Sequence, residues 1–275
     1  MPVVVITDSA ANLPLDLVEQ HRIRVVPMVL KFGDRLLRDG VDIPQGSFYA
    51  ALVEEQVPVS TSAPSAGDFG EAFERALGSA DGAVCVTVAS FVSASFEAAA
   101  GAAREFGGRV RVVDSKSASL GEGFAALEGA RLAAGGADLD AVTARAQDVA
   151  TRATLVATIN TFEFLRKTGR VNALFAYAGT ALNIKPVFAF RGGKLEQLGR
   201  PRTRARAVER MMVEVRAPDG LLHVGVVHAD CSEEADVLRA QIEDEVSTAE
   251  ILVSEFTPLM GAHTGPGVLG VAFWG

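Results

Sequence analysis

Two short apolar runs in the first half of the chain constrain its fold most strongly, VVVIT (3–7) and GAVCVTVAS (82–90). Such runs are typical of strands that are buried on both faces of a parallel sheet. RVRVVD (109–114) predicts a further strand. Helix-forming segments lie between and after these strands, at 65–77, 93–106 and 121–136. The alternation of strand and helix predicts an α/β fold, with a parallel sheet flanked by helices.

Local signals mark several helix ends in this half. Ser65 and Asp68 have the spacing of a capping box. Asn12 is expected to cap the helix formed by NLPLDLVEQH, with Pro14 in its first turn. Pro27 lies inside an apolar segment and predicts an edge strand there.

The pattern changes near residue 151. TLVATI predicts a strand, and FEFLRKTGRVNALFAYAGTAL predicts a helix in two pieces around Gly169. KPVFAFRGGKLEQLGRPR predicts a hairpin that turns at Gly192 and Gly193. Further helices and strands alternate up to a final strand, GVLGVAFWG. We expect two domains, an N-terminal α/β domain over 1–153 and a C-terminal α/β domain over 154–275.

Composition excludes several classes of protein. The formal net charge of −8 argues against nucleic acid and anionic membrane surfaces as partners. Cys85 and Cys231 form no C-x-x-C pair, so neither a disulfide framework nor a metal site is predicted. The start MPVVVITDSA reads as a strand and not as a signal peptide, which predicts a cytoplasmic protein.

Two glycine motifs resemble nucleotide-binding loops. GPGVLG (265–270) matches G-x-G-x-x-G, but a strand and not a helix is expected after it. GEGFAA (121–126) precedes a helix, yet six residues (115–120) separate it from the end of the preceding strand. A dinucleotide site needs a tight strand-to-helix turn, so we predict no nucleotide cofactor.

Two hydroxyl-rich turns open predicted helices, TSAPS (61–65) and SFVSAS (90–95). Simple capping is the commoner role of one such turn. Two of them in one parallel-sheet domain favour an anion site, because helix N-termini carry free N–H groups and positive dipole.

Two further features leave alternatives open. His263 is either a structural histidine of a glycine-rich turn or a functional group. Ser93, His263 and Asp8 could form a hydrolase triad, although no G-x-S-x-G is present. A run of arginines is either a solvated surface or a face for phosphate or an acidic partner; it comprises Arg200, Arg202, Arg204 and Arg206.

Several short motifs together resemble the DegV family from residue 4 to the end of the chain. They are ITDSAANLP, VVPM, RDGVDI, TSAPS, VVDSKSASLGEG, FLRKTGRVN, LNIKPV, RTRARA and AHTGPGVLG. The resemblance implies a two-domain protein that binds one long-chain fatty acid and no cofactor. It also implies that the protein presents the acyl carboxylate to a separate ATP-binding fatty acid kinase subunit. The product would be an acyl phosphate for phospholipid synthesis, with at most transient membrane contact.

The resemblance also implies the residues of the site. Those that would bind the carboxylate are Thr61, Ser62, Ser93, Arg170, His263 and Thr264. Arg202 and Arg204 would face the kinase partner or the transferred phosphoryl group. This chain departs from the family pattern at Ala94, Ser95 and Phe96, and it has Thr168 where the family has glycine.

Two other functions remain open from the sequence. One is an acyl hydrolase built on Ser93 and His263. The other is a module that binds lipid or a small metabolite without a kinase partner. We predict a non-catalytic binding protein, because the turns supply hydrogen-bond donors but no nucleophile elbow.

Overall fold

The computed structural model describes residues 2–43, 45–55, 57–170, 184–218 and 220–275. The strands are β1 (Val3–Asp8), β2 (Arg24–Val26), β3 (Val29–Phe32), β4 (Arg35–Arg38), β5 (Val59–Ser62), β6 (Gly82–Thr87), β7 (Val110–Asp114), β8 (Thr154–Thr158), β9 (Val187–Arg191), β10 (Lys194–Gly199), β11 (Leu221–His228), β12 (Thr248–Glu255) and β13 (Leu269–Trp274). The α-helices are α1 (Leu15–Gln20), α2 (Gln45–Glu54), α3 (Ala66–Leu77), α4 (Ser95–Ala103), α5 (Leu120–Ala134), α6 (Leu139–Arg152), α7 (Glu163–Lys167), α9 (Arg204–Arg216), α10 (Ser232–Glu245) and α11 (Pro258–Thr264). Two short 3₁₀ helices are η1 (Ser9–Ala11) and η2 (Arg104–Phe106).

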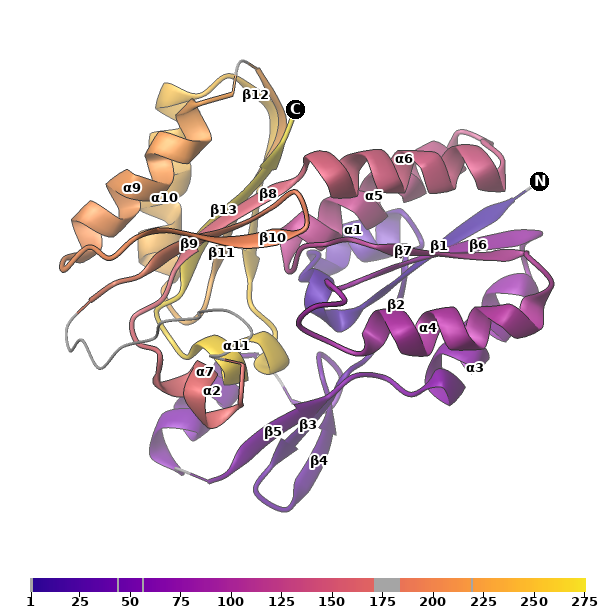
Figure 1. Ribbon diagram of the computed structural model, residues 1–275, viewed down its shortest axis with the longest axis horizontal. Helices are drawn as coiled ribbons and strands as arrows, with labels where there is room; N and C mark the ends of the chain where they lie inside the picture. Colours follow the sequence, from indigo (N-terminus) through magenta and orange to yellow (C-terminus); the bar gives the residue numbers. More distant parts are fainter. Residues whose placement is uncertain (1, 44, 56, 171–183, 219) are drawn as a thin grey trace.

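The first sheet is parallel and has the order β2-β1-β6-β7. Helices α3 and α4 cover one face, and α5 and α6 cover the other (Figure 1). Every residue of β6 is buried, as its continuous apolar run requires. The predicted α/β fold with a parallel sheet and flanking helices is therefore confirmed.

The second sheet is mixed and has the order β10-β9-β8-β13-β11-β12. Only β11 and β12 pair in parallel among its described strands. Helices α9 and α10 cover its outer face, while its inner face is turned toward α5 and the first sheet (Figure 1). All its strands lie at or after residue 154, and those of the other sheets lie before it. A domain boundary between residues 153 and 154 remains our proposal.

A third, antiparallel sheet has the order β4-β3-β5. It lies below the other two, beside α2 (Figure 1). Helix α11 comes from the far end of the chain and packs against α2, β3 and β5. This packing brings segments about 200 residues apart in the sequence to one place, which positions the site described below.

Helix α5 lies between the two larger sheets and is buried over nearly its whole first three turns. Close packing there depends on glycine. A Cβ atom on Gly123 would lie 2.8 Å from the carbonyl oxygen of Ala11. One on Gly225 of β11 would lie 2.4 Å from a methyl group of Leu120. Small residues thus allow the helix to approach both neighbours.

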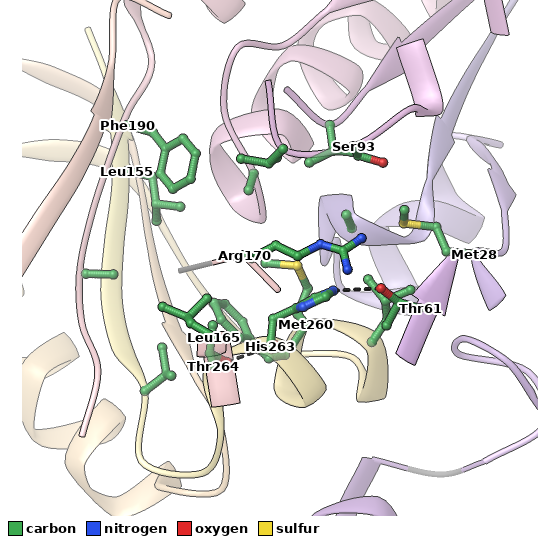
Figure 2. A pocket seen from close by; sticks show the side chains of 18 of the residues that line it. Met28, Thr61, Ser93, Leu155, Leu165, Arg170, Phe190, Met260, His263 and Thr264 are labelled. Atoms are coloured by element: carbon green, nitrogen blue, oxygen red, sulfur yellow. Dashed lines mark hydrogen bonds between the residues drawn. The ribbon is translucent and has the colours of Figure 1, made fainter. Parts of the chain in front are cut away.

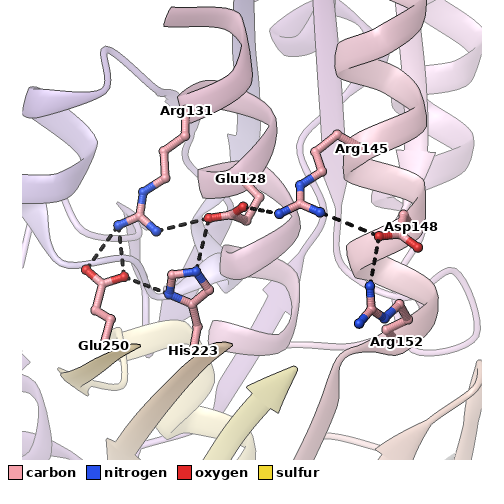
Figure 3. Close-up of polar contacts among 7 residues, drawn as sticks. All are labelled: Glu128, Arg131, Arg145, Asp148, Arg152, His223 and Glu250. Carbon is pink, nitrogen blue, oxygen red and sulfur yellow. Dashed lines mark hydrogen bonds and ion pairs between the residues drawn. The ribbon is translucent and has the colours of Figure 1, made fainter. Parts of the chain in front are cut away.

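A network of charged side chains joins α5 and α6 to β11 and β12 (Figure 3). Glu128 accepts from Arg131 at 3.0 Å and pairs with Arg145. On the other side, Glu250 binds Arg131 at 2.9 Å and His223 Nδ1 at 2.9 Å. The arginines hold the pKa of Glu128 below its usual value, although burial opposes this. The network therefore ties the first half of the chain to the second.

The structure confirms some local predictions and corrects others. Ser65 and Asp68 form the capping box of α3, and Gly192 and Gly193 turn the hairpin. Asn12 does not cap α1; it has a left-handed conformation (φ 52°) and ends η1, while Pro14 precedes α1. Helix α6, which Asp138 caps, has no counterpart among the predicted elements.

Two predictions concern other parts of the chain. Pro27 follows β2, an edge strand, and marks the passage to another sheet. The second helical piece expected after Gly169 falls on residues 171–183, which lie outside the described residues. Within the ranges that the structure describes, no helix has the length and apolar character needed to cross a membrane.

Candidate functional site

A mainly apolar cavity of about 180 Å³ lies where the three sheets meet (Figure 2). Its walls come from both halves of the chain and include Met28, Leu155, Leu165, Phe188, Phe190 and Leu259. Five polar residues also line it, namely Thr61, Ser93, Arg170, His263 and Thr264. The sequence predicted all five as ligand-binding residues, and the structure brings them to one cavity.

His263 and Thr61 form one polar contact of this cavity. Thr61 lies on β5 and His263 on α11, and the hydroxyl of Thr61 is 2.9 Å from Nε2 of the imidazole. The other ring nitrogen, Nδ1, is 2.9 Å from the hydroxyl of Thr168. Both nitrogens are thus engaged by threonine hydroxyls.

The electrostatics of the cavity keep His263 neutral. Burial lowers its pKa from 6.5 to about 3, and the charge of Arg170 acts in the same direction. Arg170 donates to the carbonyl oxygen of Thr168 at 2.7 Å. Figure 2 shows its guanidinium group lying between Ser93 and His263. A cation inside an apolar cavity is suited to an anionic head group.

Ser93 lies in the turn before α4, on the wall opposite His263. Its hydroxyl is 3.1 Å from that of Ser95 and accepts from the Ser95 N–H at 3.3 Å. Ser95 in turn contacts Asp8, whose carboxylate accepts from the N–H groups of Ala10 and Val88. Burial raises the pKa of Asp8 to about 6. These contacts fix the position of Ser93 and leave its hydroxyl lining the cavity.

Three predicted site residues lie elsewhere. Ser62 is exposed, because side chains alternate along β5 and Thr61 faces the cavity. Arg202 is exposed two residues before α9, and Arg204, the first residue of α9, pairs with Glu234 at 2.7 Å. Neither arginine lines the cavity, so their role toward a partner stays a prediction.

Thr264 is the last of the five polar residues that line the cavity. Its hydroxyl donates a hydrogen bond to the carbonyl oxygen of Met260 at 2.8 Å. A hydroxyl that is bonded within its own helix has its proton occupied, so Thr264 is left with its oxygen lone pairs for any ligand. The structure places Thr264 at the cavity, and its part in binding a ligand stays a prediction.

The hydrolase triad is not assembled among the described residues. Ser93 contacts Ser95, His263 contacts two threonines, and Asp8 contacts backbone N–H groups.

Neither glycine motif forms a nucleotide-binding loop between a strand and a helix. GEGFAA lies inside α5, and GPGVLG spans the turn after α11 and the first two residues of β13. Gly265 and Gly267 have φ of 74° and 81° there, a conformation that favours glycine.

Two functional candidates emerge only from the structure. In the sequence Thr168 stands out only as a departure from a family motif, whereas in the structure it contacts both His263 and Arg170. Glu122 is fully buried beside Asp8, and burial followed by the charge of Asp8 raises its pKa. Glu122 is more than 110 positions from Thr7 and Asp8 in the sequence, and no motif links them. Only the packing of α5 against β1 brings Glu122 beside these two residues. Among the described residues, no cluster of three or more metal-ligating side chains occurs.

Comparisons with known proteins agree in pointing to one family. A family model described as uncharacterised proteins of the DegV family matches residues 2–275. A DegV domain-containing protein of Streptomyces coelicolor is 36% identical, over 98% of this chain and 97% of its own length. A structure titled as showing fatty acid binding by a DegV family protein of Thermus thermophilus superimposes with a TM-score of 0.92. It is 30% identical and covers 100% of this chain and 99% of its own. The DegV protein of Bacillus subtilis, titled a fatty acid binding protein, has a TM-score of 0.88 at 25% identity, with both chains covered completely.

Proposed function

Because the chain belongs to the DegV family, we propose that it binds a single long-chain fatty acid in the cavity between its sheets. In this proposal it requires no cofactor and acts in the cytoplasm. It presents the acyl carboxylate to a separate ATP-dependent fatty acid kinase subunit, which forms the acyl phosphate used in phospholipid synthesis. Contact with membranes is at most transient, and nucleic acid is not a partner.

The observation that carries this proposal is the polarity of the cavity. Aliphatic and aromatic side chains form most of its wall, and one cation and several hydroxyl groups also line it. An acyl chain gains about 0.8 kcal/mol for each methylene group that leaves water. Arg170 and Ser93 can meet the charged head group with hydrogen bonds. A fatty acid matches both parts, and two structural relatives are titled as fatty acid binding proteins.

The same geometry favours binding over hydrolysis. A general base works best with a pKa near the working pH, whereas burial holds the pKa of His263 at about 3. Both of its ring nitrogens are also engaged by threonines rather than by Ser93. These contacts support a non-catalytic role for the chain.

Solvent extraction tests the proposed ligand. The purified protein should release about one long-chain fatty acid per chain, which mass spectrometry identifies. Ser93→Ala should lower affinity by about 10-fold to 100-fold, because a charge-assisted hydrogen bond is lost. Ser90→Ala in the same turn is the matched control, since Ser90 bonds Asp114 outside the cavity. Release of a small metabolite, or an empty protein that turns over p-nitrophenyl esters, would refute the proposal.

The kinase partnership is tested separately through the arginines. Arg202→Ala should leave fatty acid affinity within about twofold, because the residue is exposed and outside the cavity lining. Acyl phosphate formation with a competent kinase subunit should fall by about tenfold and become less sensitive to salt. The equally exposed Arg206 provides the control variant, Arg206→Ala. Equal rates for wild type and Arg202→Ala at every salt concentration would leave Arg202 as a solvated surface residue.

A further inference from the structure

Thr168 contacts two of the polar groups that line the cavity, although it does not line the cavity itself. It is buried directly after α7. Its hydroxyl is 2.9 Å from the carbonyl oxygen of Phe164 and 2.9 Å from Nδ1 of His263. Its own carbonyl oxygen accepts from Arg170 at 2.7 Å. A single residue thus touches both the imidazole and the guanidinium group.

The directions of these hydrogen bonds follow from counting protons. A carbonyl oxygen can only accept, so the hydroxyl of Thr168 donates its one proton to Phe164. The same hydroxyl must then accept from His263, which requires a proton on Nδ1. In a neutral imidazole the other nitrogen, Nε2, carries no proton and accepts. Thr61 is its partner, so Thr61 donates to His263.

We propose that Thr168 is a positioning residue that holds His263 in the Nδ1–H tautomer, so that His263 and Thr61 direct their protons at protein groups. The hydroxyl of Ser93 and the remaining N–H groups of Arg170 are then the donors that meet a carboxylate in this cavity. The second statement rests on the proposed function, whereas the first does not. In this arrangement His263 acts as an acceptor that orders Thr61 and makes no hydrogen bond to the ligand.

The charges around His263 are consistent with a neutral ring. Arg170 is the charged group that acts on it, and burial acts in the same direction. The cavity wall also carries Thr61, Ser93 and Thr264, none of which ionises. A neutral ring must choose between two tautomers, and the hydroxyl of Thr168 decides that choice.

Nitrogen-15 NMR of the lipid-free protein tests the tautomer directly, because protonated and unprotonated ring nitrogens differ strongly in chemical shift. The wild type should show the Nδ1–H form in at least about tenfold excess, since the alternative leaves a buried hydrogen bond unmade. Thr168→Ser should keep this form, because serine retains the hydroxyl. Thr168→Val has a similar shape without the hydroxyl and should lose the excess. An Nε2–H ring in the wild type, or an unchanged ring in Thr168→Val, would overturn the proposal.

Ligand affinities test the second statement. In Thr168→Val, a proton on Nε2 would free the Thr61 hydroxyl to donate into the cavity. The preference for a fatty acid over the fatty alcohol of equal length should then rise by about threefold or more, while Thr168→Ser matches the wild type. If Thr168→Val changes the tautomer but leaves the preference for acid over alcohol unchanged, the tautomer does not control whether Thr61 donates to the head group, and the second statement is wrong. If no fatty acid binds to the wild type, the proposed function fails while the tautomer measurement still stands.

Discussion

Acidification from pH 7 to pH 5 should cost the protein about 2 kcal/mol of its free energy of unfolding through His263 alone. Burial, assisted by Arg170, lowers the pKa of this imidazole from 6.5 to about 3 in the folded state. Below pH 6.5 the unfolded chain therefore binds a proton that the folded protein does not. The stabilisation is fully present above pH 6.5 and decreases steadily as the pH falls toward 3. Over that whole range the loss reaches about 5 kcal/mol.

Urea unfolding at a series of pH values measures this effect. His263→Gln has a neutral amide at every pH, so its stability should decrease less between pH 7 and pH 5, by about 2 kcal/mol. The comparison uses the slope with pH, which a uniform loss of stability in the variant does not change. His21→Gln, at the end of α1 and outside the cavity lining, should retain most of the wild-type slope. Parallel profiles for wild type and His263→Gln would show that the imidazole is solvated and protonates in the folded state.

Removal of Arg170 should have the largest effect on ligand binding. Its guanidinium group is the cation that lines the cavity among the described residues, and it lies between Ser93 and His263. Arg170→Ala should weaken fatty acid binding by about 30-fold or more, because the carboxylate would be buried without a charged partner. Binding of the fatty alcohol of equal length should change by less than about threefold, since its head group carries no charge. Titration of both ligands into the lipid-free protein gives the comparison.

Arg166→Ala provides the matched control for this variant. Arg166 is exposed on α7, four positions before Arg170 and outside the cavity lining. It should bind both ligands like the wild type. An equal loss of acid and alcohol binding in Arg170→Ala would mean that the variant distorts the cavity, and unchanged acid binding would remove Arg170 from the head-group site. The variant should also raise the pKa of His263, because the charge of Arg170 is one of the two causes that lower it.

The sequence predicted the parts of the fold that depend on local chemistry. A continuous apolar run identified β6, and the reciprocal hydrogen bonds of Ser65 and Asp68 mark the start of α3. Helix α6 was not predicted, although Asp138 caps it and its buried positions, Val142, Ala146 and Val149, have helical spacing. Its hydrophobic face is built largely from alanine and valine, which give a weaker apolar contrast than leucine or phenylalanine.

The candidate site depended on different information. Thr61 and His263 are 202 positions apart, and only the packing of α11 against β5 brings them into contact. Motifs matched to a family supplied both residues, whereas periodicity and spacing could not. The strand alternation that turns Ser62 away from the cavity is also a tertiary property, because a four-residue strand does not itself show which face is covered. Thr168 shows the limit of motif matching, since its contacts arise where this chain departs from the pattern.

The charged network between the two halves encloses a useful chromophore. Trp274 is the single tryptophan of the chain, and only 1% of its surface is exposed. Its ring stacks on the imidazole of His223, which lies on β11, with 5.2 Å between the ring centroids. The guanidinium carbon of Arg145 on α6 lies over the same ring, 4.7 Å from its centroid. The indole therefore senses both sides of the seam between α6 and the second sheet. Its emission wavelength can follow the separation of these two parts in real time in the unmodified protein, without an attached dye, because water reaches the ring only when they move apart.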